Sequence, residues 1–305
     1  MTEVLFMTGR LFALLAAICW GFDFIALILG MKHLEPFAFN GLRFFLGALF
    51  LVPVLLYFRS EINISLKSLK PLFLAIILMS SSLFIATALQ QFGLQTASAT
   101  DGGFISGLYI IFVPMLGILI NQKVSNNTWF GASISVIGLF FLSAKYDLSL
   151  NIGDTLILIS AIFWALNILI TDHFVKYHSA LLLAFCQFFF CGLISLSLSL
   201  FLENSYDANK IYLAGGALLY SGIFSVALGF TLQVMAQKSV SPSHVAIILS
   251  IEAVFAATGG WYLLNESLTA IQMSGCSLML GGIILSQIKK PILNILKPSN
   301  SANSK

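Results

Sequence analysis

Three charged residues lie inside long apolar runs of the sequence. Asp23 and Arg43 occur in neighbouring runs near the N-terminus, and Glu252 occurs in a run near the C-terminus. A charge at the centre of a membrane-spanning helix costs roughly 2.5–3.5 kcal/mol on insertion scales, so such residues usually pair or function inside the protein. The chemistry open to these three is ion pairing, substrate binding and proton uptake.

Asp23 and Arg43 are expected at similar depth on consecutive spans, at a rise of about 1.5 Å per helical residue. This placement predicts an Asp23–Arg43 ion pair. Two interpretations stay open. The pair is either a static link between two helices or part of a gate or clamp, because the planar guanidinium fork of arginine matches a substrate carboxylate.

Glu252 lies among alanines and glycines, and the expected depths place Arg43 too far away to pair with it. A carboxyl group in a dry site without a cation favours its neutral form. Glu252 is therefore a candidate for proton coupling or for binding a substrate ammonium group. The alternative is a structural glutamate that stays protonated or hydrogen-bonded.

Several uncharged side chains are further candidates to line a binding site. Trp20 and Trp164 lie near the centres of their runs, not at the membrane interfaces where tryptophan is enriched, which indicates either a cavity wall or close packing. Amides inside the runs either hydrogen-bond a substrate or join helices. These secondary candidates are Gln90, Asn167, Gln187 and Gln233.

The composition excludes a soluble enzyme, a disordered chain and a disulfide scaffold. Of 305 residues, 59% are hydrophobic and 9% are charged, against about 25% charged in an ordinary soluble domain. A bilayer core needs about 20 apolar residues per helix. Ten such runs predict an all-α polytopic membrane protein, and they cover 11–31, 37–58, 71–94, 102–120, 128–144, 155–171, 180–202, 211–236, 245–264 and 268–288.

The lysines and arginines between the runs predict the direction of insertion. With a cytoplasmic N-terminus, eleven of them fall on the inner side and three on the outer side. Cytoplasmic loops carry the excess of these residues, so both termini are expected to be cytoplasmic. No cluster of lysine and arginine on a polar surface indicates nucleic-acid binding.

The two halves of the chain resemble each other at an offset of 143–144 residues. Trp20 matches Trp164, and Gln90 matches Gln233. Tyr109 is the counterpart of Glu252 and a candidate to line the same site, with an aromatic packed in the core as the alternative. Five spans per half is an odd number, so the second half enters the membrane in the opposite sense. Inverted repeats are typical of alternating-access transporters with substrate near the midplane.

The repeat divides the chain into two units. We expect a cytoplasmic N-terminus over 1–10, repeats over 11–144 and 155–288, a linker over 145–154, and a cytoplasmic tail over 289–305. The substrate is expected between the halves, near Trp20, Asp23, Arg43, Tyr109, Trp164 and Glu252.

Short motifs add a family resemblance. Ala-Ile-Cys-Trp-Gly occupies 17–21, Ala-Ile-Phe-Trp-Ala occupies 161–165, and Ile-Glu-Ala-Val-Phe-Ala-Ala occupies 251–257, followed by Asn-Glu-Ser-Leu-Thr at 265–269. With the 5+5 arrangement, the chain resembles the drug/metabolite transporter superfamily in its EamA-type branch. It departs from the usual pattern at Ala253, where the family has proline, and at Asn265, where the family has glycine.

The resemblance implies a proton-linked or facilitative carrier of a small polar metabolite, often an amino acid or amine derivative. A multidrug or nucleotide-like exporter of the same fold is the alternative. An intramembrane enzyme is remote because no nucleophile–base or metal motif occurs, and the short loops disfavour a receptor or scaffold. No catalytic residue, metal or cofactor is expected. We expect a monomer or homodimer in a bacterial inner membrane.

Overall fold

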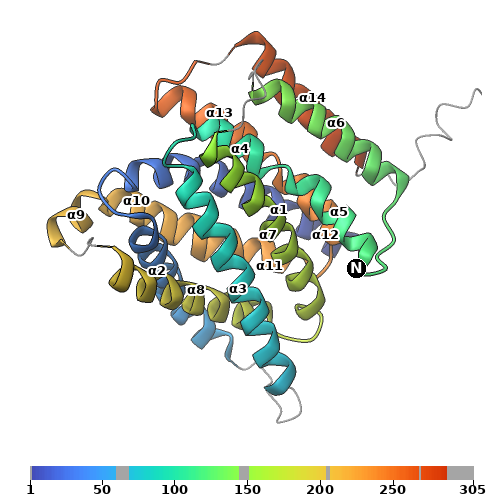
Figure 1. Ribbon diagram of the computed structural model, residues 1–305. Helices are drawn as coiled ribbons and strands as arrows, with labels where there is room; N and C mark the ends of the chain where they lie inside the picture. The colour runs from blue at the N-terminus through green and yellow to red at the C-terminus, as the bar shows by residue number, and fades with distance from the viewer. Residues whose placement is uncertain (1, 60–68, 144–150, 204–206, 268, 287–305) are drawn as a thin grey trace, which may run out of the picture.

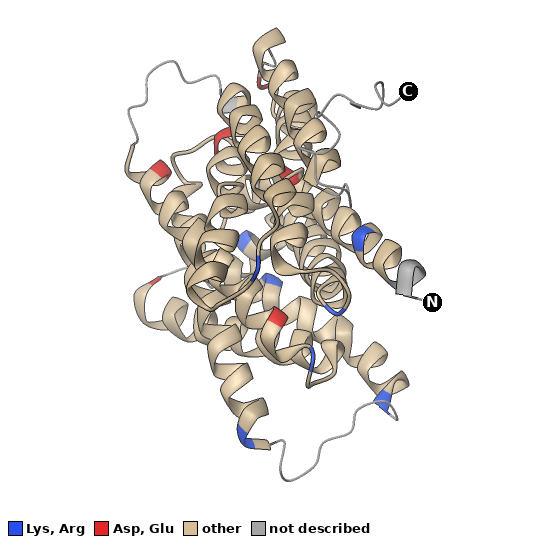
Figure 2. Cartoon of the chain, turned by 90° about the vertical axis from the view of Figure 1, so that its right-hand side faces the viewer, with Lys and Arg blue, Asp and Glu red and all other residues tan. Residues whose placement is uncertain are grey.

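The computed structural model describes residues 2–59, 69–143, 151–203, 207–267 and 269–286 (Figure 1). In these ranges the regular secondary structure is helical. Eight helical segments are long and apolar enough to cross a membrane. Figure 2 shows how few positions along these helices carry a charge. The chain is therefore an all-α polytopic membrane protein.

Five of the eight segments are single helices. They are α1 (Thr2–Gly30), α2 (Pro36–Tyr57), α3 (Leu69–Gly93), α7 (Ile152–Phe174) and α8 (Ala180–Leu202). They match the expected spans within several residues at each end. The largest difference is at the N-terminus, where α1 begins at Thr2 and includes residues that were expected to precede the first span. The expected tail 289–305 and residues 145–150 of the expected linker lie outside the described residues.

Two segments are each broken near the middle, at corresponding places in the two halves. The fourth expected span consists of α4 (Ala99–Ser106) and α5 (Tyr109–Leu119), and the ninth of α12 (Pro242–Leu249) and α13 (Glu252–Leu263). At one break Leu108 N donates to Ile105 O at 3.2 Å, and at the other Ile251 N donates to Ile248 O at 3.3 Å. These short i→i+3 bonds tighten one turn. Each second half-helix thus begins at Tyr109 or at Glu252.

The eighth expected span contains a π-helix. The short helices α9 (Ala208–Leu213) and α10 (Gly215–Leu219) lead into the π-helix η3 (Tyr220–Phe230), which continues as α11 (Thr231–Ala236). Long π-helical stretches are rare, and shorter π-bulges often occur at functional sites. η3 packs against α1 and α2.

The fifth and tenth expected spans are α6 (Asn126–Ser143) and α14 (Ala270–Ser286), which lie side by side at one edge of the bundle (Figure 1). α14 is a shorter apolar helix of 17 residues, and α6 opens with two asparagines. Their backbones approach closely at glycines. A Cβ atom added at Gly138 would lie 2.7 Å from Gly275 O, and one at Gly131 would lie 2.6 Å from Gly282 O.

Two glutamates in loops cap the starts of distant helices. Glu203 accepts hydrogen bonds from Phe37 N and Ala38 N, both at 2.8 Å, at the start of α2. Glu266 accepts from Ala99 N at 3.2 Å at the start of α4. Carboxylates stabilise helix N-termini by satisfying free N–H groups and by opposing the helix dipole. These caps give Glu203 and Glu266 a structural role.

The backbone conformation at position 265 explains why asparagine can replace the glycine of the family pattern there. The φ angle of Asn265 is 56°, in the left-handed region, and Asn121 in the first half has a φ of 61°. Glycine adopts this conformation without strain, and asparagine is among the few other residues that do so routinely. The departure from the motif therefore preserves the turn.

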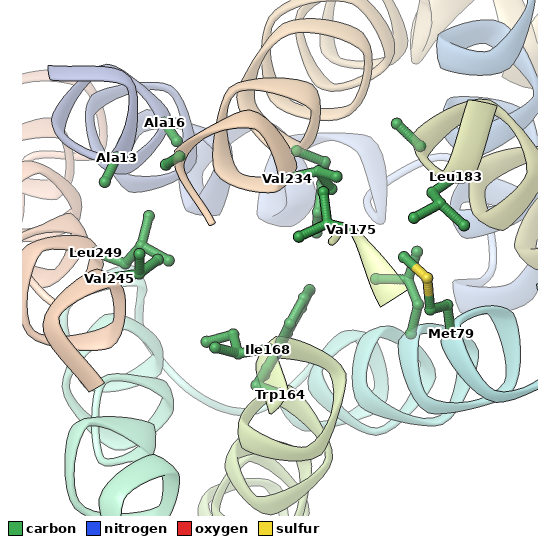
Figure 3. Packing of buried hydrophobic residues seen from close by; sticks show 14 of the residues in the cluster. Ala13, Ala16, Met79, Trp164, Ile168, Val175, Leu183, Val234, Val245 and Leu249 are labelled. Carbon is green, nitrogen blue, oxygen red and sulfur yellow. The ribbon is translucent and has the colours of Figure 1, made fainter. Parts of the chain in front are cut away.

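The largest apolar core contains Ala13, Ala16 and Trp20 of α1. It is completed by side chains of other helices, which include Met79, Ile168, Leu183, Val234, Val245 and Leu249 (Figure 3). All are buried. A second core contains Phe24 and Leu27 of α1 together with Phe39 and Leu94.

The glycine contacts between α6 and α14 predict opposite effects for two alanine substitutions. Gly138→Ala should lower the free energy of unfolding by about 1–3 kcal/mol, because the new methyl group meets backbone atoms. Gly281→Ala, on α14 with no atom within 4 Å of its added Cβ, should be neutral or stabilising, since alanine favours helix by about 1 kcal/mol. Thermal unfolding in detergent measures both. Equal effects of the two variants would contradict the packing described here.

Candidate functional site

A cavity inside the bundle is lined by residues of both apolar cores. It is bordered by Trp20, Asp23, Phe24, Leu27, Arg43, Gln90, Ser106, Tyr109, Trp164, Ser225, Phe230 and Glu252. The structure thus brings all six expected substrate-binding residues to one place, together with Gln90. The space open to the centre of a water-sized sphere is about 30 Å³. A water needs about 10–15 Å³ by this measure, so this closed conformation has room for only a few waters.

Asp23 and Arg43 form the expected ion pair. Arg43 Nη1 donates to Asp23 Oδ2 at 2.9 Å, and the two residues are 2% and 4% exposed. Arg43 also donates from Nη1 to Ser221 Oγ at 3.2 Å, and from Nε and Nη2 to Asn40 Oδ1 at 3.2 and 3.1 Å. All three guanidinium nitrogens are therefore occupied, which favours the static link over a free carboxylate clamp.

The pair is the centre of a larger polar network. Ser225 Oγ donates to Asp23 Oδ2 at 2.6 Å. Asn40 Nδ2 donates to Thr87 Oγ1 at 3.1 Å and to Ser195 Oγ at 3.0 Å. The network joins α1, α2, α3, α8 and η3. Within this network, Asp23 Oδ1 is buried and has no hydrogen-bond partner among the described residues.

Glu252 differs from the pair. It is 3% exposed and forms no ion pair with any described residue. The Tyr109 hydroxyl, which has no other hydrogen-bond partner in the described structure, is a polar neighbour that interacts with the Glu252 carboxyl group, and the charge of Asp23 also acts on it. The cavity therefore holds one carboxylate that is paired with a cation and one carboxyl group that has no cationic partner among the described residues.

Three aromatic rings from both halves form one wall. The ring centroids of Trp20 and Trp164 are 6.0 Å apart, and Phe230 lies 4.5 Å from Trp20 and 5.6 Å from Trp164. Trp20 Nε1 donates to Ser225 O at 3.3 Å, and Trp164 Nε1 donates to Gln90 Oε1 at 3.2 Å. The indole edges are thus held by hydrogen bonds, and the three rings cluster with centroid separations typical of aromatic pairs.

The secondary candidates separate into one cavity residue and three others. Gln90 lines the cavity and donates to Ser106 Oγ at 3.3 Å. Asn167 does not border the cavity and joins α7 to α3, because its Nδ2 donates to Met79 O and Ser82 Oγ, both at 3.1 Å. Gln233 donates to Gln237 Oε1 at 2.8 Å. Both amide atoms of Gln187 are buried without a partner among the described residues.

Sequence reasoning missed five cavity residues, which are Phe24, Leu27, Ser106, Ser225 and Phe230. Phe24 and Leu27 are apolar residues of α1, Ser106 directly precedes the break between α4 and α5, and Ser225 and Phe230 belong to the π-helix η3. The internal repeat could have indicated Ser225, because Ser82 occupies the equivalent position in the first half, 143 residues earlier. No comparable signal marks the π-helix.

The charged pair has an uncharged counterpart in the second half. Asn167 and Gln187 lie 144 positions after Asp23 and Arg43. The hydrogen bond between Asn167 and Ser82 corresponds to the one between Asp23 and Ser225. The two halves therefore share the positions of this polar contact but not its charge.

The arrangement of long apolar helices around a buried polar cavity, with walls from both halves, defines a polytopic membrane transporter. Comparison with known proteins gives the family. The model of the EamA-like transporter family matches residues 7–144 and again 151–287. The chain belongs to this family, which confirms the resemblance derived from the motifs. Members of the family are transporters and not enzymes.

Relatives and a solved structure agree with this assignment. An uncharacterized transporter of Archaeoglobus fulgidus is 29% identical over 90% of this chain and 84% of its own length. The uncharacterized transporter YoaV of Bacillus subtilis is 23% identical, with 88% and 92% covered. A solved crystal structure superimposes with a TM-score of 0.74 at 16% identity, covering 92% of this chain and 98% of its own, and supports the fold alone.

The buried network predicts a non-additive pair of substitutions. Arg43→Gln should lower the free energy of unfolding by about 3–5 kcal/mol, because it leaves Asp23 as a buried charge without its cation. The double variant Asp23→Asn with Arg43→Gln should recover part of that loss, since it removes both charges together and leaves the same residue types that the second half has at the equivalent positions. Thermal unfolding of the purified variants measures the difference. The single variant Asp23→Asn is measured as well. If the loss in free energy of unfolding in the double variant equals the sum of the losses in the two single variants, the two side chains act independently.

Proposed function

We propose that this protein is a secondary transporter that binds a small polar metabolite, most simply an amino acid or amine derivative, in the cavity around Glu252. It works by alternating access between two inverted five-helix repeats, with both termini in the cytoplasm of a bacterial cell and the chain in the inner membrane. The family assignment supports transport as such. The side chains around the cavity support the substrate class.

The observation that carries the substrate class is the free carboxyl group beside an aromatic wall. Arg43 is neutralised by Asp23, so Glu252 is the cavity charge that still lacks a counter-ion. An ammonium group is attracted to a carboxylate and to the faces of tryptophan, tyrosine and phenylalanine rings. Trp20, Trp164 and Phe230 present such rings. A substrate amine or a proton can therefore occupy the same place, which supports coupling of transport to protons.

The closed cavity supports alternating access. A volume of about 30 Å³ is too small for a metabolite, so binding requires the halves to separate. Apolar residues of the two cores lie on α1 before and after Asp23. The breaks before Tyr109 and before Glu252 lie at equivalent positions of the two halves, where half-helices can tilt. Discontinuous helices next to a midplane site are a recurring feature of transporters built from inverted repeats.

Substitution of Glu252 tests this proposal. In proteoliposomes preloaded with pools of amino acids and amines, Glu252→Gln should reduce exchange at least about tenfold and remove its dependence on pH, because the amide neither binds a proton nor pairs with an ammonium group. Counterflow of labelled substrate measures the rate. Glu35→Gln, exposed before α2, is the matched control and should exchange normally. An unchanged rate and pH profile for Glu252→Gln would remove this residue from the mechanism.

The aromatic wall gives a second test. Trp164→Leu should raise the KM for an amine substrate by about 3–30-fold, in line with a cation–π contribution of about 0.5–2 kcal/mol. Trp164→Phe should raise the KM less, because it keeps an aromatic ring. Initial rates of counterflow at varied substrate concentration measure this. Equal effects of both variants would mean that the ring face is not used.

The alternative is a multidrug or nucleotide-like exporter. The aromatic wall is compatible with it, because planar apolar compounds also stack on such rings. Weak competition by many unrelated compounds, together with no exchange of any amino acid or amine pool, would favour this alternative.

A further inference from the structure

A second hollow lies on the outside of the bundle, separate from the central cavity. It runs between α1, the short helices α9 and α10, and the end of α13, and the space open to the centre of a water-sized sphere is about 680 Å³. This is within the range of about 300–1,000 Å³ common for small-molecule sites. None of its lining residues borders the central cavity. We call it the lateral groove.

The walls of the lateral groove are apolar along its length. They include Phe22, Ile25, Leu29, Leu213, Ala217 and Leu263. Leu213 and Leu263 are exposed large hydrophobic side chains, and Leu29 is 39% exposed. On the outer surface of a membrane-spanning helix, such a groove is expected to face the lipid acyl chains.

One end of the groove is cationic. Lys32 and His33 lie directly after the end of α1 at Gly30, at the level where a spanning helix meets the lipid headgroups. The Lys32 ammonium group makes no ion pair or hydrogen bond with a described residue. No acidic residue lines the groove. An unpaired cation at the headgroup level, above an apolar slot, is complementary to a phosphate attached to an acyl chain.

A glycine on α10 leaves space in the groove. Gly216 lines it, and a Cβ atom added at Gly216 would meet no atom within 4 Å. Glycine is otherwise unfavourable in a helix by about 1 kcal/mol relative to alanine. A larger side chain at this position would fill the groove without disturbing its walls.

We propose that the lateral groove binds a single membrane phospholipid, with an acyl chain along the apolar wall and the phosphate at Lys32. The lipid lies against Tyr220, whose hydroxyl donates to Cys19 O at 3.1 Å and so joins η3 to α1. The next residue, Ser221, accepts a hydrogen bond from Arg43. The bound lipid thus supports the contact between α1 and η3 that holds the buried ion pair. This inference requires only that the chain is in a membrane and is independent of the transported substrate.

Thermal unfolding of delipidated protein in detergent tests the proposal with three probes. Phosphatidylglycerol should raise the Tm by about 3 °C or more, diacylglycerol with the same acyl chains should raise it less, and inorganic phosphate should leave it unchanged. Lys32→Gln should reduce the effect of phosphatidylglycerol to that of diacylglycerol. Native mass spectrometry counts the lipids that remain bound.

Glycine variants separate the groove from the rest of the lipid-facing surface. Gly216→Leu should abolish the Tm increase and remove one bound lipid, because its side chain occupies the slot. Gly281→Leu on α14, where an added Cβ also meets nothing within 4 Å, should behave as the unmodified protein. If both variants keep the same lipid response, the groove holds no specific lipid and the proposal is wrong. Equal stabilisation by phosphate alone would assign the site to a free anion.

Discussion

The structure depends on the cost of placing Arg43 inside an apolar bundle. A guanidinium group buried in a membrane protein is stable only when its charge is balanced and its donors are satisfied. Asp23 balances the charge, and Asn40, Ser221 and Asp23 accept the hydrogen bonds. Because these partners lie on α1, α2 and η3, the need to satisfy one side chain determines how three spans meet.

This constraint also decides the chemistry of the cavity. With Arg43 occupied, the site has no free cation to offer a substrate, and Glu252 has no cation to neutralise it. The two acidic residues of the cavity therefore differ, because Asp23 is paired with Arg43 and Glu252 has no cationic partner among the described residues. The same difference explains why the polar contacts correspond between the halves while the charges do not. Asn167 and Gln187 hold equivalent positions without charge.

Much of the fold and of the site could be predicted from particular residues. The apolar runs marked the helices because a bilayer imposes length and composition directly. Trp20, Asp23, Arg43, Tyr109, Trp164 and Glu252 were selected because polar or amphipathic side chains inside such runs must face the protein interior. The structure places all six on one cavity. Asn167, Gln187 and Gln233 met the same criterion but lie elsewhere, because the sequence does not distinguish an amide that joins helices from one that faces a cavity.

The sequence by itself determined that the chain spans a membrane, that its halves are related, and which buried side chains need partners. These properties follow from hydropathy, spacing and the cost of buried charge, which act locally along the chain. Only the tertiary structure decided that every guanidinium nitrogen of Arg43 has a partner and that Glu252 has no cation to pair with, because partners such as Ser221 come from segments far from Arg43 in the chain. The π-helix η3 and the breaks before Tyr109 and Glu252 were likewise visible only in the tertiary structure. Such departures from regular helix depend on packing against neighbouring helices, which no single segment specifies.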